Sequence, residues 1–155
     1  MVEGPSDEIV FERVFRDIHG KSPSQCGIDV LSMRGLSLAR GLELCAALNK
    51  PVTALRDNDG ISPADLRGPV QQWLKPGIRE LFIGEVGDGK TLEPQLIKSC
   101  GEPLLREILG VTPAANLMTW MTREKTEAAL RISESSKTIG PPPYILQAVR
   151  FVHGQ

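Results

Sequence analysis

Short runs of β-branched and apolar residues alternate with longer amphipathic stretches through the first half of the chain. The runs predict strands, and they lie at residues 1–3, 27–31, 51–56 and 80–83. Apolar positions three and four apart predict the intervening helices, at residues 5–20, 38–48 and 62–73. Strands that alternate with helices of this length are typical of a parallel sheet covered on both faces. The pattern therefore predicts an α/β fold with a four-stranded parallel sheet.

The pattern changes after residue 84. Further helical stretches follow, near residues 95–109, 114–122, 123–134 and 144–152. A proline-rich loop at 135–143 separates the last two. We expect one structural unit, in which residues 1–100 form the core that contains the sheet and residues 101–155 form a helical extension that completes its site.

The first predicted strand, Met1–Glu3, is unusually short, because central strands commonly have about five or six residues. We infer that the chain is a fragment of a longer protein whose preceding residues supply the rest of this strand. The strand itself is expected to be short and frayed.

Composition excludes several classes of protein. A hydrophobic content of 41% and a charged content of 24% are near globular averages, and 155 residues suit one domain. The widely spaced Cys26, Cys45 and Cys100 form no C-x-x-C pair, which excludes a disulfide framework and a thiolate zinc site. No apolar run approaches the ~20 residues of a membrane span. We therefore expect a cytoplasmic protein with no membrane partner.

Two acidic clusters follow predicted strands. Glu3 ends the first strand and Asp7 begins the next helix, while Asp57 and Asp59 follow the strand at 51–56. The carboxyl ends of parallel strands meet at one edge of a sheet, where such folds bind their ligands. Asp57 and Asp59 are expected on one side, because residues two apart in an extended backbone point the same way. Converging carboxylates predict a divalent-metal site, with Mg²⁺ or Mn²⁺ favoured by oxygen ligands.

The formal net charge of −1 is at first sight unfavourable for binding nucleic acid. Two divalent ions on the clustered acids would add four positive charges, while the 18 Lys and Arg residues remain elsewhere. The net charge therefore does not exclude DNA as a partner.

Several short motifs occur in an order that is similar to a known family. They are Glu3-Gly4-x-Ser6-Asp7, Asp57-Asn58-Asp59, Thr91-Leu92-Glu93, Lys125-Thr126-x-x-Ala129 and, after the proline-rich loop, Tyr144-Ile145. Together they resemble the Toprim domain in the carboxy-terminal region of OLD (overcoming lysogenisation defect) nucleases, over almost the whole chain. The resemblance implies a Toprim-like (Rossmann-like) four-stranded parallel sheet flanked by helices, with a helical carboxy-terminal extension.

The resemblance also implies a function. The family consists of metal-dependent DNA nucleases, so we expect an endonuclease or nickase that hydrolyses phosphodiester bonds with two Mg²⁺ or Mn²⁺ ions. The ligands of the first ion would be Glu3, Asp7, Asp57 and Asp59. The second ion would use Glu93, with Glu85 as the alternative. Glu3 and Lys125 would be catalytic, the lysine by stabilising charge on the phosphorane or on the leaving oxygen.

The expected partners follow from the same resemblance. DNA would be held mainly through its phosphates, which makes binding salt-sensitive and weakly dependent on sequence. An amino-terminal ABC-type ATPase domain would precede this region in the same protein. The other partner that we consider is a second copy of the chain, which would make the full-length protein a homodimer.

Two alternatives stay open. Gly84-Glu85-Val86-Gly87-Asp88-Gly89-Lys90-Thr91 matches the Walker A pattern and would make the chain an NTP-binding module. Against it, no later apolar strand ends in Asp, Pro94 follows closely, and two carboxylates would enter a cradle for phosphates. The other alternative is a Toprim domain that has no catalytic activity and acts as an interaction domain.

Overall fold

The computed structural model describes residues 1–34 and 37–154 and contains a small parallel sheet. Strand β1 (Val52–Arg56) pairs with strand β2 (Arg79–Ile83), with Val52 opposite Arg79. The two carboxyl ends therefore lie at the same edge. The predicted α/β class and parallel pairing are confirmed, but among the described residues the sheet has two strands where we expected four.

Residues 1–3 run beside β1 without forming a strand of their own. The Met1 ammonium donates to the Thr53 carbonyl at 2.7 Å, and the Leu55 N–H donates to the Met1 carbonyl at 2.9 Å. On its other side Val2 forms a single parallel bridge with Ser32. The strands expected at 1–3 and 27–31 are reduced to this bridge, because so short a segment offers each neighbour only one or two residues to pair with.

The loop that the sequence predicts at 33–35 is described as far as residue 34, and Gly35 lies outside the described residues.

Helices make up most of the remaining structure. Their bounds are α1 (Pro5–His19), α2 (Leu38–Ala47), α3 (Pro63–Arg67), α4 (Leu92–Cys100), α5 (Glu102–Leu109), α6 (Leu117–Arg123), α7 (Lys125–Glu134) and α8 (Pro143–His153). Short 3₁₀ turns lie at η1 (Ser24–Cys26), η2 (Gly68–Trp73) and η3 (Val86–Asp88). The helix predicted at 62–73 is α3 continued by η2, because Pro69 has no N–H for the α-helical ladder.

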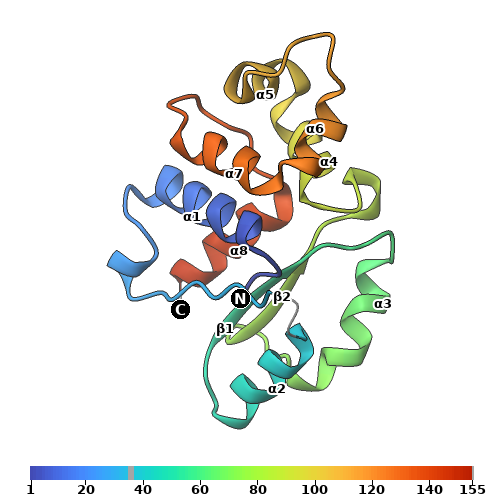
Figure 1. Cartoon of the computed structure of the whole chain (residues 1–155). Helices are drawn as coiled ribbons and strands as arrows, with labels where there is room; N and C mark the ends of the chain where they lie inside the picture. The colour runs from blue at the N-terminus through green and yellow to red at the C-terminus, as the bar shows by residue number, and fades with distance from the viewer. Residues whose placement is uncertain (35–36, 155) are drawn as a thin grey trace.

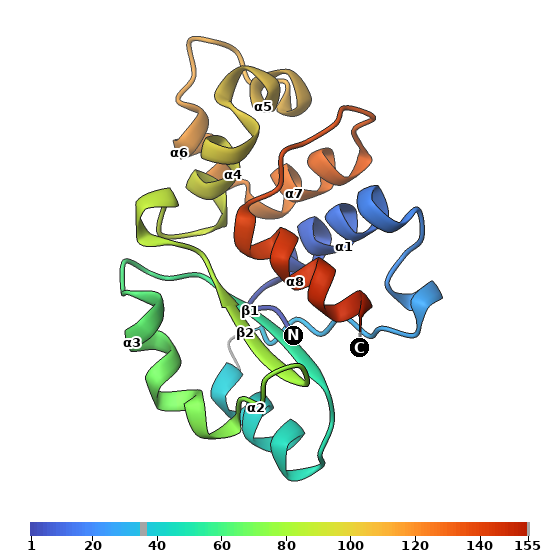
Figure 2. The same cartoon turned by 180° about the vertical axis from the view of Figure 1, so that it is seen from behind.

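The sheet has helices on both faces. Figures 1 and 2 show α1, α7 and α8 on one side of the strands, and α2 and α3 on the other. Side chains of β1 alternate between two cores, since Leu55 packs with the first group and Ala54 with the second. The sequence pattern predicted this covering on both faces.

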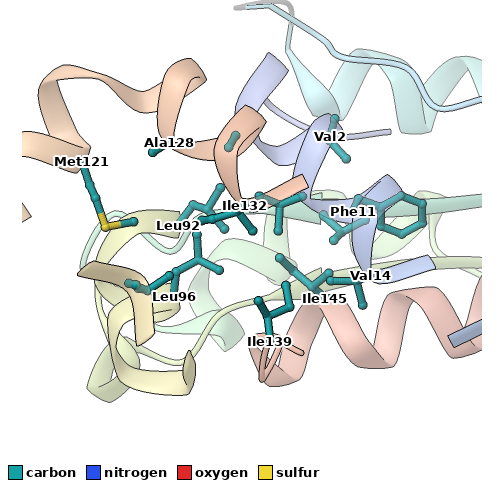
Figure 3. Packing of buried hydrophobic residues seen from close by; sticks show 14 of the residues in the cluster. Val2, Phe11, Val14, Leu92, Leu96, Met121, Ala128, Ile132, Ile139 and Ile145 are labelled. Carbon is teal, nitrogen blue, oxygen red and sulfur yellow. The ribbon is translucent and has the colours of Figure 1, made fainter. Parts of the chain in front are cut away.

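The larger core joins the amino-terminal segment to the carboxy-terminal helices. Val2, Phe11 and Leu92 share it with Met121 and Ile145, as Figure 3 shows. Residues from both predicted parts of the chain are thus fully buried against one another, which fixes α4 and α7 relative to the start of α1.

A buried arginine adds a polar link between α1 and α7. Arg13 is 6% exposed and donates to the backbone carbonyls of Ile132, Ser135 (2.6 Å) and Lys137 (2.8 Å). Charge-assisted bonds of this kind are stronger than neutral ones. Arg13 therefore holds the carboxyl end of α7 on α1.

Among the described residues, no helix has both the length and the apolar character that a membrane crossing requires.

Candidate metal centre

Glu3 and Asp7 are brought together by the start of α1. Gly4 precedes the helix with an extended backbone, and Pro5 occupies its first turn. The Gly4 N–H donates to Asp7 Oδ2 at 3.1 Å, so the Asp7 side chain folds back toward Gly4, the residue after Glu3. A helix start of this kind therefore sets two carboxylates on the same edge of the sheet.

Asp57 lies directly after β1. Its backbone N–H donates to Glu3 Oε2 at 3.4 Å, which joins the ends of the two neighbouring segments. Its side-chain Oδ1 is buried and has no hydrogen-bond partner among the described residues. A buried acceptor without a partner costs free energy, and native proteins commonly fill such a position with water or an ion.

Glu93 reaches the same edge from the first turn of α4. It is 4% exposed, accepts a hydrogen bond from the Thr91 hydroxyl at 2.7 Å, and lies 3.2 Å from the Lys125 ammonium. Lys125 is the first residue of α7 and is half exposed. The structure thus brings Glu93 and Lys125 into direct contact, although they are far apart in the sequence.

The acids repel one another, as their pKa values show. Burial, followed by the charges of Asp7, Glu3 and Glu93, raises the pKa of Asp57 to about 8. Burial and then Glu3 raise the pKa of Asp7 to about 6. Burial also raises the pKa of Glu3. Four carboxylates therefore lie within electrostatic reach of one another, and a nearby cation would relieve their mutual repulsion.

Tyr144 borders this cluster from the first turn of α8. Burial raises the pKa of its hydroxyl well above the ordinary value, and the same four carboxylates raise it further. Its ring is 4% exposed and belongs to the larger core. The Tyr144 hydroxyl therefore lies within electrostatic range of the four acids.

The donor set fits a hard divalent cation. Glu3, Asp7, Asp57 and Glu93 supply only oxygen atoms, which Mg²⁺ and Mn²⁺ prefer. Arg56, 3.6 Å from Glu3, and Lys125 are the cations paired with these four, which leaves a formal charge of −2 that one divalent ion would cancel. Among the described residues, however, no three of these side chains are already grouped closely enough to hold an ion. The carboxylates converge, and rotation of their side chains would have to close them around a metal.

Asp59 lies at the rim of the cluster and not beside Asp57 as we expected. The extended backbone ends at Arg56, and Asp59 has a left-handed φ of 51°. Its side chain is 58% exposed and lies 3.8 Å from the Arg56 guanidinium. Its charge still contributes to the raised pKa of Glu3, so Asp59 remains within electrostatic range of the site.

Glu85 is not brought to the cluster. It is exposed at the residue before η3, and among the described residues it neither pairs with Lys125 nor contributes to the raised pKa values of Glu3, Asp7 and Asp57. The position expected as the alternative to Glu93 thus lies apart from the converging carboxylates.

Asn58 organises the glycine-rich loop. It is completely buried, and its Nδ2 donates to the carbonyls of Gly84 at 3.0 Å and Gly89 at 2.6 Å. Its Oδ1 accepts the Gly60 N–H at 2.8 Å. The Asn58 side chain therefore fastens residues 84–89 to the end of β1.

The interior of this loop is occupied by protein groups. A Cβ on Gly84 would lie 2.2 Å from Gln95 Oε1, so the Gln95 side chain fills the space beside that glycine. The N–H groups of Asp88 and Gly89 donate to carbonyls within the loop. In a phosphate cradle these N–H groups would face the ligand.

Sequence reasoning missed Asn58, Arg56 and Tyr144 as parts of the site. Asn58 sits in an Asp-Asn-Asp-Gly turn, and such turns commonly use the Asn side chain to bind nearby backbone. That local signal predicts a turn, but it does not reveal the contacts with Gly84 and Gly89.

One protein family matches the chain. Residues 1–59 match the model described as "Overcoming lysogenization defect protein-like, TOPRIM domain". No curated protein and no solved structure gives a significant match. The matched segment contains Glu3, Asp7, Asp57 and Asp59, and it ends before Glu93 and Lys125. Residues 1–59 of the chain are therefore similar to the TOPRIM domain of OLD-like proteins.

Proposed function

We propose that the chain is the catalytic part of a DNA endonuclease or nickase that hydrolyses phosphodiester bonds with Mg²⁺ or Mn²⁺. TOPRIM domains typically bind divalent ions and act on nucleic acids, which supports this class of activity. The observation that carries the proposal is Asp57 Oδ1, buried and unpaired within a group of four carboxylates. A divalent cation would satisfy this oxygen and cancel the repulsion that raises the pKa values of Asp57 and Asp7.

The proposed ligand sets follow from the positions of the acids. Glu3, Asp7 and Asp57 would hold the first ion, and Asp59 would join them from the rim. Glu93 would hold the second, and its burial and proximity to Asp57 favour it over the exposed Glu85. Bound ions would supply an activated water and charge neutralisation at the phosphate.

The chain itself contributes a fixed cation. The Lys125 ammonium is held 3.2 Å from Glu93 by the start of α7, which Arg13 fastens to α1 at its other end. A preorganised ammonium stabilises charge that develops on a phosphoryl oxygen without reorganising. We therefore propose Lys125, with Glu3, as a catalytic residue.

Other cations suit the DNA backbone. Lys90 is exposed, and its carbonyl accepts the Asp59 N–H at 3.0 Å, so it lies at the same edge as the acids. Contacts of this kind to phosphate predict binding that weakens with salt. The amino-terminal ATPase domain and the second copy of the chain stay predictions from the resemblance.

The test is the nicking of supercoiled plasmid by the chain in Mn²⁺ or Mg²⁺, with EDTA as the metal-free arm. We expect metal-dependent nicking that Asp57→Asn and Lys125→Ala reduce strongly and that Lys90→Ala reduces only weakly. Asp29→Asn is the matched control, because Asp29 is an exposed acid outside the cluster and loses the same charge.

Each other outcome has a defined meaning. Metal binding without nicking would overturn the nuclease proposal in favour of an interaction domain. Nucleotide binding, with activity lost only in Lys90→Ala, would favour the glycine-rich loop as the functional site.

A further inference from the structure

A cavity of about 440 Å³ opens beside the carboxylates on the α2 and α3 side of the sheet. This volume is within the range of small-molecule sites. Two charged residues, Glu3 and Arg56, line it. The apolar lining comes from Met33, Leu38, Ala39, Leu66, Val70 and Leu81.

We propose that this cavity receives a nucleobase of the DNA strand next to the phosphate that is cut. The inference rests on the proposed nuclease function and adds a binding site for the substrate to it. Glu3 carries the link, because it belongs both to the carboxylate cluster and to the lining of the cavity. A phosphate held at the carboxylates would bring the neighbouring nucleoside to the cavity mouth.

The walls select the apolar part of a nucleotide. Leu81 is 1% exposed and Val70 is 8% exposed, so the cavity is bounded by core side chains. An apolar floor cannot replace the water around a phosphate, whereas it can accept the face of a base. Met33 adds an adaptable side chain that fits rings of different shape.

Arg56 is available for the phosphate at the mouth. Its guanidinium is 3.6 Å from Glu3 and 3.8 Å from Asp59, and both distances exceed the roughly 2.7–2.9 Å of a strong charge-assisted hydrogen bond. Its remaining bond is a long contact of 3.2 Å from Nε to the Asp57 carbonyl. A loosely held arginine between two acids can turn to a phosphate when a metal ion takes their charge.

The lining predicts the kind of recognition. Ser37 is its neutral polar side chain, so the edges of the base would meet few specific donors and acceptors. The base must also leave its stack, which is easier in single-stranded or nicked DNA than in an intact duplex. We therefore expect a requirement for a base at one position, with little preference for its identity.

The first experiment reads base insertion without cleavage. Single-stranded oligonucleotides carry the fluorescent base 2-aminopurine at successive positions, and the protein is added with Ca²⁺, a hard ion that accepts oxygen ligands. We expect fluorescence to rise at one position, because an inserted base is unstacked. Ala39→Phe and, as a second variant, Leu66→Phe fill the cavity and should remove the rise. Ala47→Phe, on the exposed end of α2, should keep it.

The second experiment uses cleavage in Mn²⁺. An oligonucleotide that lacks the base at that position should be cut at least about tenfold less efficiently than the intact one by the wild type and by Ala47→Phe. Ala39→Phe should cut both oligonucleotides equally slowly. Thermal unfolding and Mn²⁺ titration of each variant show whether its fold and metal site are intact.

The two proposals fail differently. If DNA is cut but no position shows insertion, or if the filled variants behave like the wild type, the base site is wrong and the nuclease proposal stands. If the chain neither binds nor cuts DNA, the nuclease proposal is wrong and the base site falls with it.

Discussion

The carboxylate cluster and the glycine-rich loop at 84–91 lie at the same edge of the sheet, yet their internal chemistry differs. In the cluster, Asp57 has a buried oxygen without a partner, and burial together with repulsion by three other acids raises the pKa of Asp57 to about 8. In the loop, Asn58 binds the carbonyls of Gly84 and Gly89, and loop N–H groups donate within the loop. Gln95 Oε1 beside Gly84 is also buried without a partner, but it is a neutral amide oxygen, whereas the unpartnered oxygen of the cluster belongs to a carboxyl surrounded by other acids.

This difference separates the acidic cluster from the Walker-like loop, which the sequence left open as an alternative functional site. A phosphate cradle needs N–H groups that are free to turn toward the ligand. A metal centre needs acceptors whose charge is not yet balanced. Satisfaction of polar groups is a property of the folded structure, and it favours the acidic cluster over the Walker-like loop as the reactive site.

Removal of the Lys125 ammonium should have the largest effect. We expect Lys125→Met to lower the rate of Mn²⁺-dependent nicking by about 10²–10³-fold, which is typical when one preorganised donor to a developing charge is lost. Lys125→Arg should retain part of the activity. Lys90→Met makes the same substitution in the loop and should change the rate less than about threefold. Equal losses at the two lysines would remove the distinction between cluster and loop.

The loop should matter for stability. Asn58→Ala deletes three hydrogen bonds and leaves the Gly84 and Gly89 carbonyls without their donor, so we expect a loss of roughly 2–4 kcal/mol in the free energy of unfolding in urea. Gln72→Ala, at an exposed amide, should cost less than about 0.5 kcal/mol. A loss below about 1 kcal/mol for Asn58→Ala would show that the loop does not depend on this clamp.

The cluster should make the metal-free protein less stable as pH rises. The folded-state pKa values of Asp7 and Asp57 are raised, so their contribution is fully present below pH about 4 and is lost as pH rises through about 6 and about 8. Asp57→Asn should therefore stabilise the metal-free chain at pH 8 by about 1–2 kcal/mol after solvent screening, and have no such effect at pH 4.

Thermal unfolding without and with Mn²⁺ measures this effect. The metal should stabilise the wild type most at high pH, because ion binding requires the ionised acids, and it should not stabilise Asp57→Asn. Asp29→Asn controls for the loss of one surface charge. If the stability of the metal-free wild type follows that of Asp57→Asn from pH 4 to 8, the acids do not repel one another as we propose.

The sequence predicted those features of the site that depend on local signals, namely where helices and strands begin and end. Pro5 and the acids after it mark the start of α1, and the apolar run before Asp57 marks β1, so the positions of Glu3, Asp7 and Asp57 followed from where elements begin and end. The structure brings these three together. Whether they bind a metal stays a prediction.

Long-range contacts explain what the sequence could not reveal. The segment at 27–31 has strand-like residues, but it becomes a strand only if a long neighbour pairs with it, and Val2 supplies a single bridge. We expected Asp59 to point the same way as Asp57, as residues two apart in an extended backbone do. That expectation failed, because the strand ends at Arg56 and the backbone then turns. Asn58 and Arg56 acquire their roles from residues distant in the chain, and residue type alone does not indicate those partners.

The smallest effects should come from Gly87, which occupies a variable position of the Walker A pattern. A Cβ on Gly87 would meet nothing within 4 Å, so Gly87→Ala should change stability by less than about 0.5 kcal/mol and nicking by less than about twofold. Gly89 has a φ of 126° and a Cβ there would lie 2.6 Å from Pro94, so Gly89→Ala should cost more than about 1 kcal/mol. Mg²⁺ and ATP at millimolar concentration should leave the melting temperature within about 1 °C, because a ligand that does not bind the folded state cannot stabilise it. A clear ATP-dependent rise that Lys90→Ala abolishes would instead mean that the loop opens for a nucleotide and that its internal hydrogen bonds are only its resting arrangement.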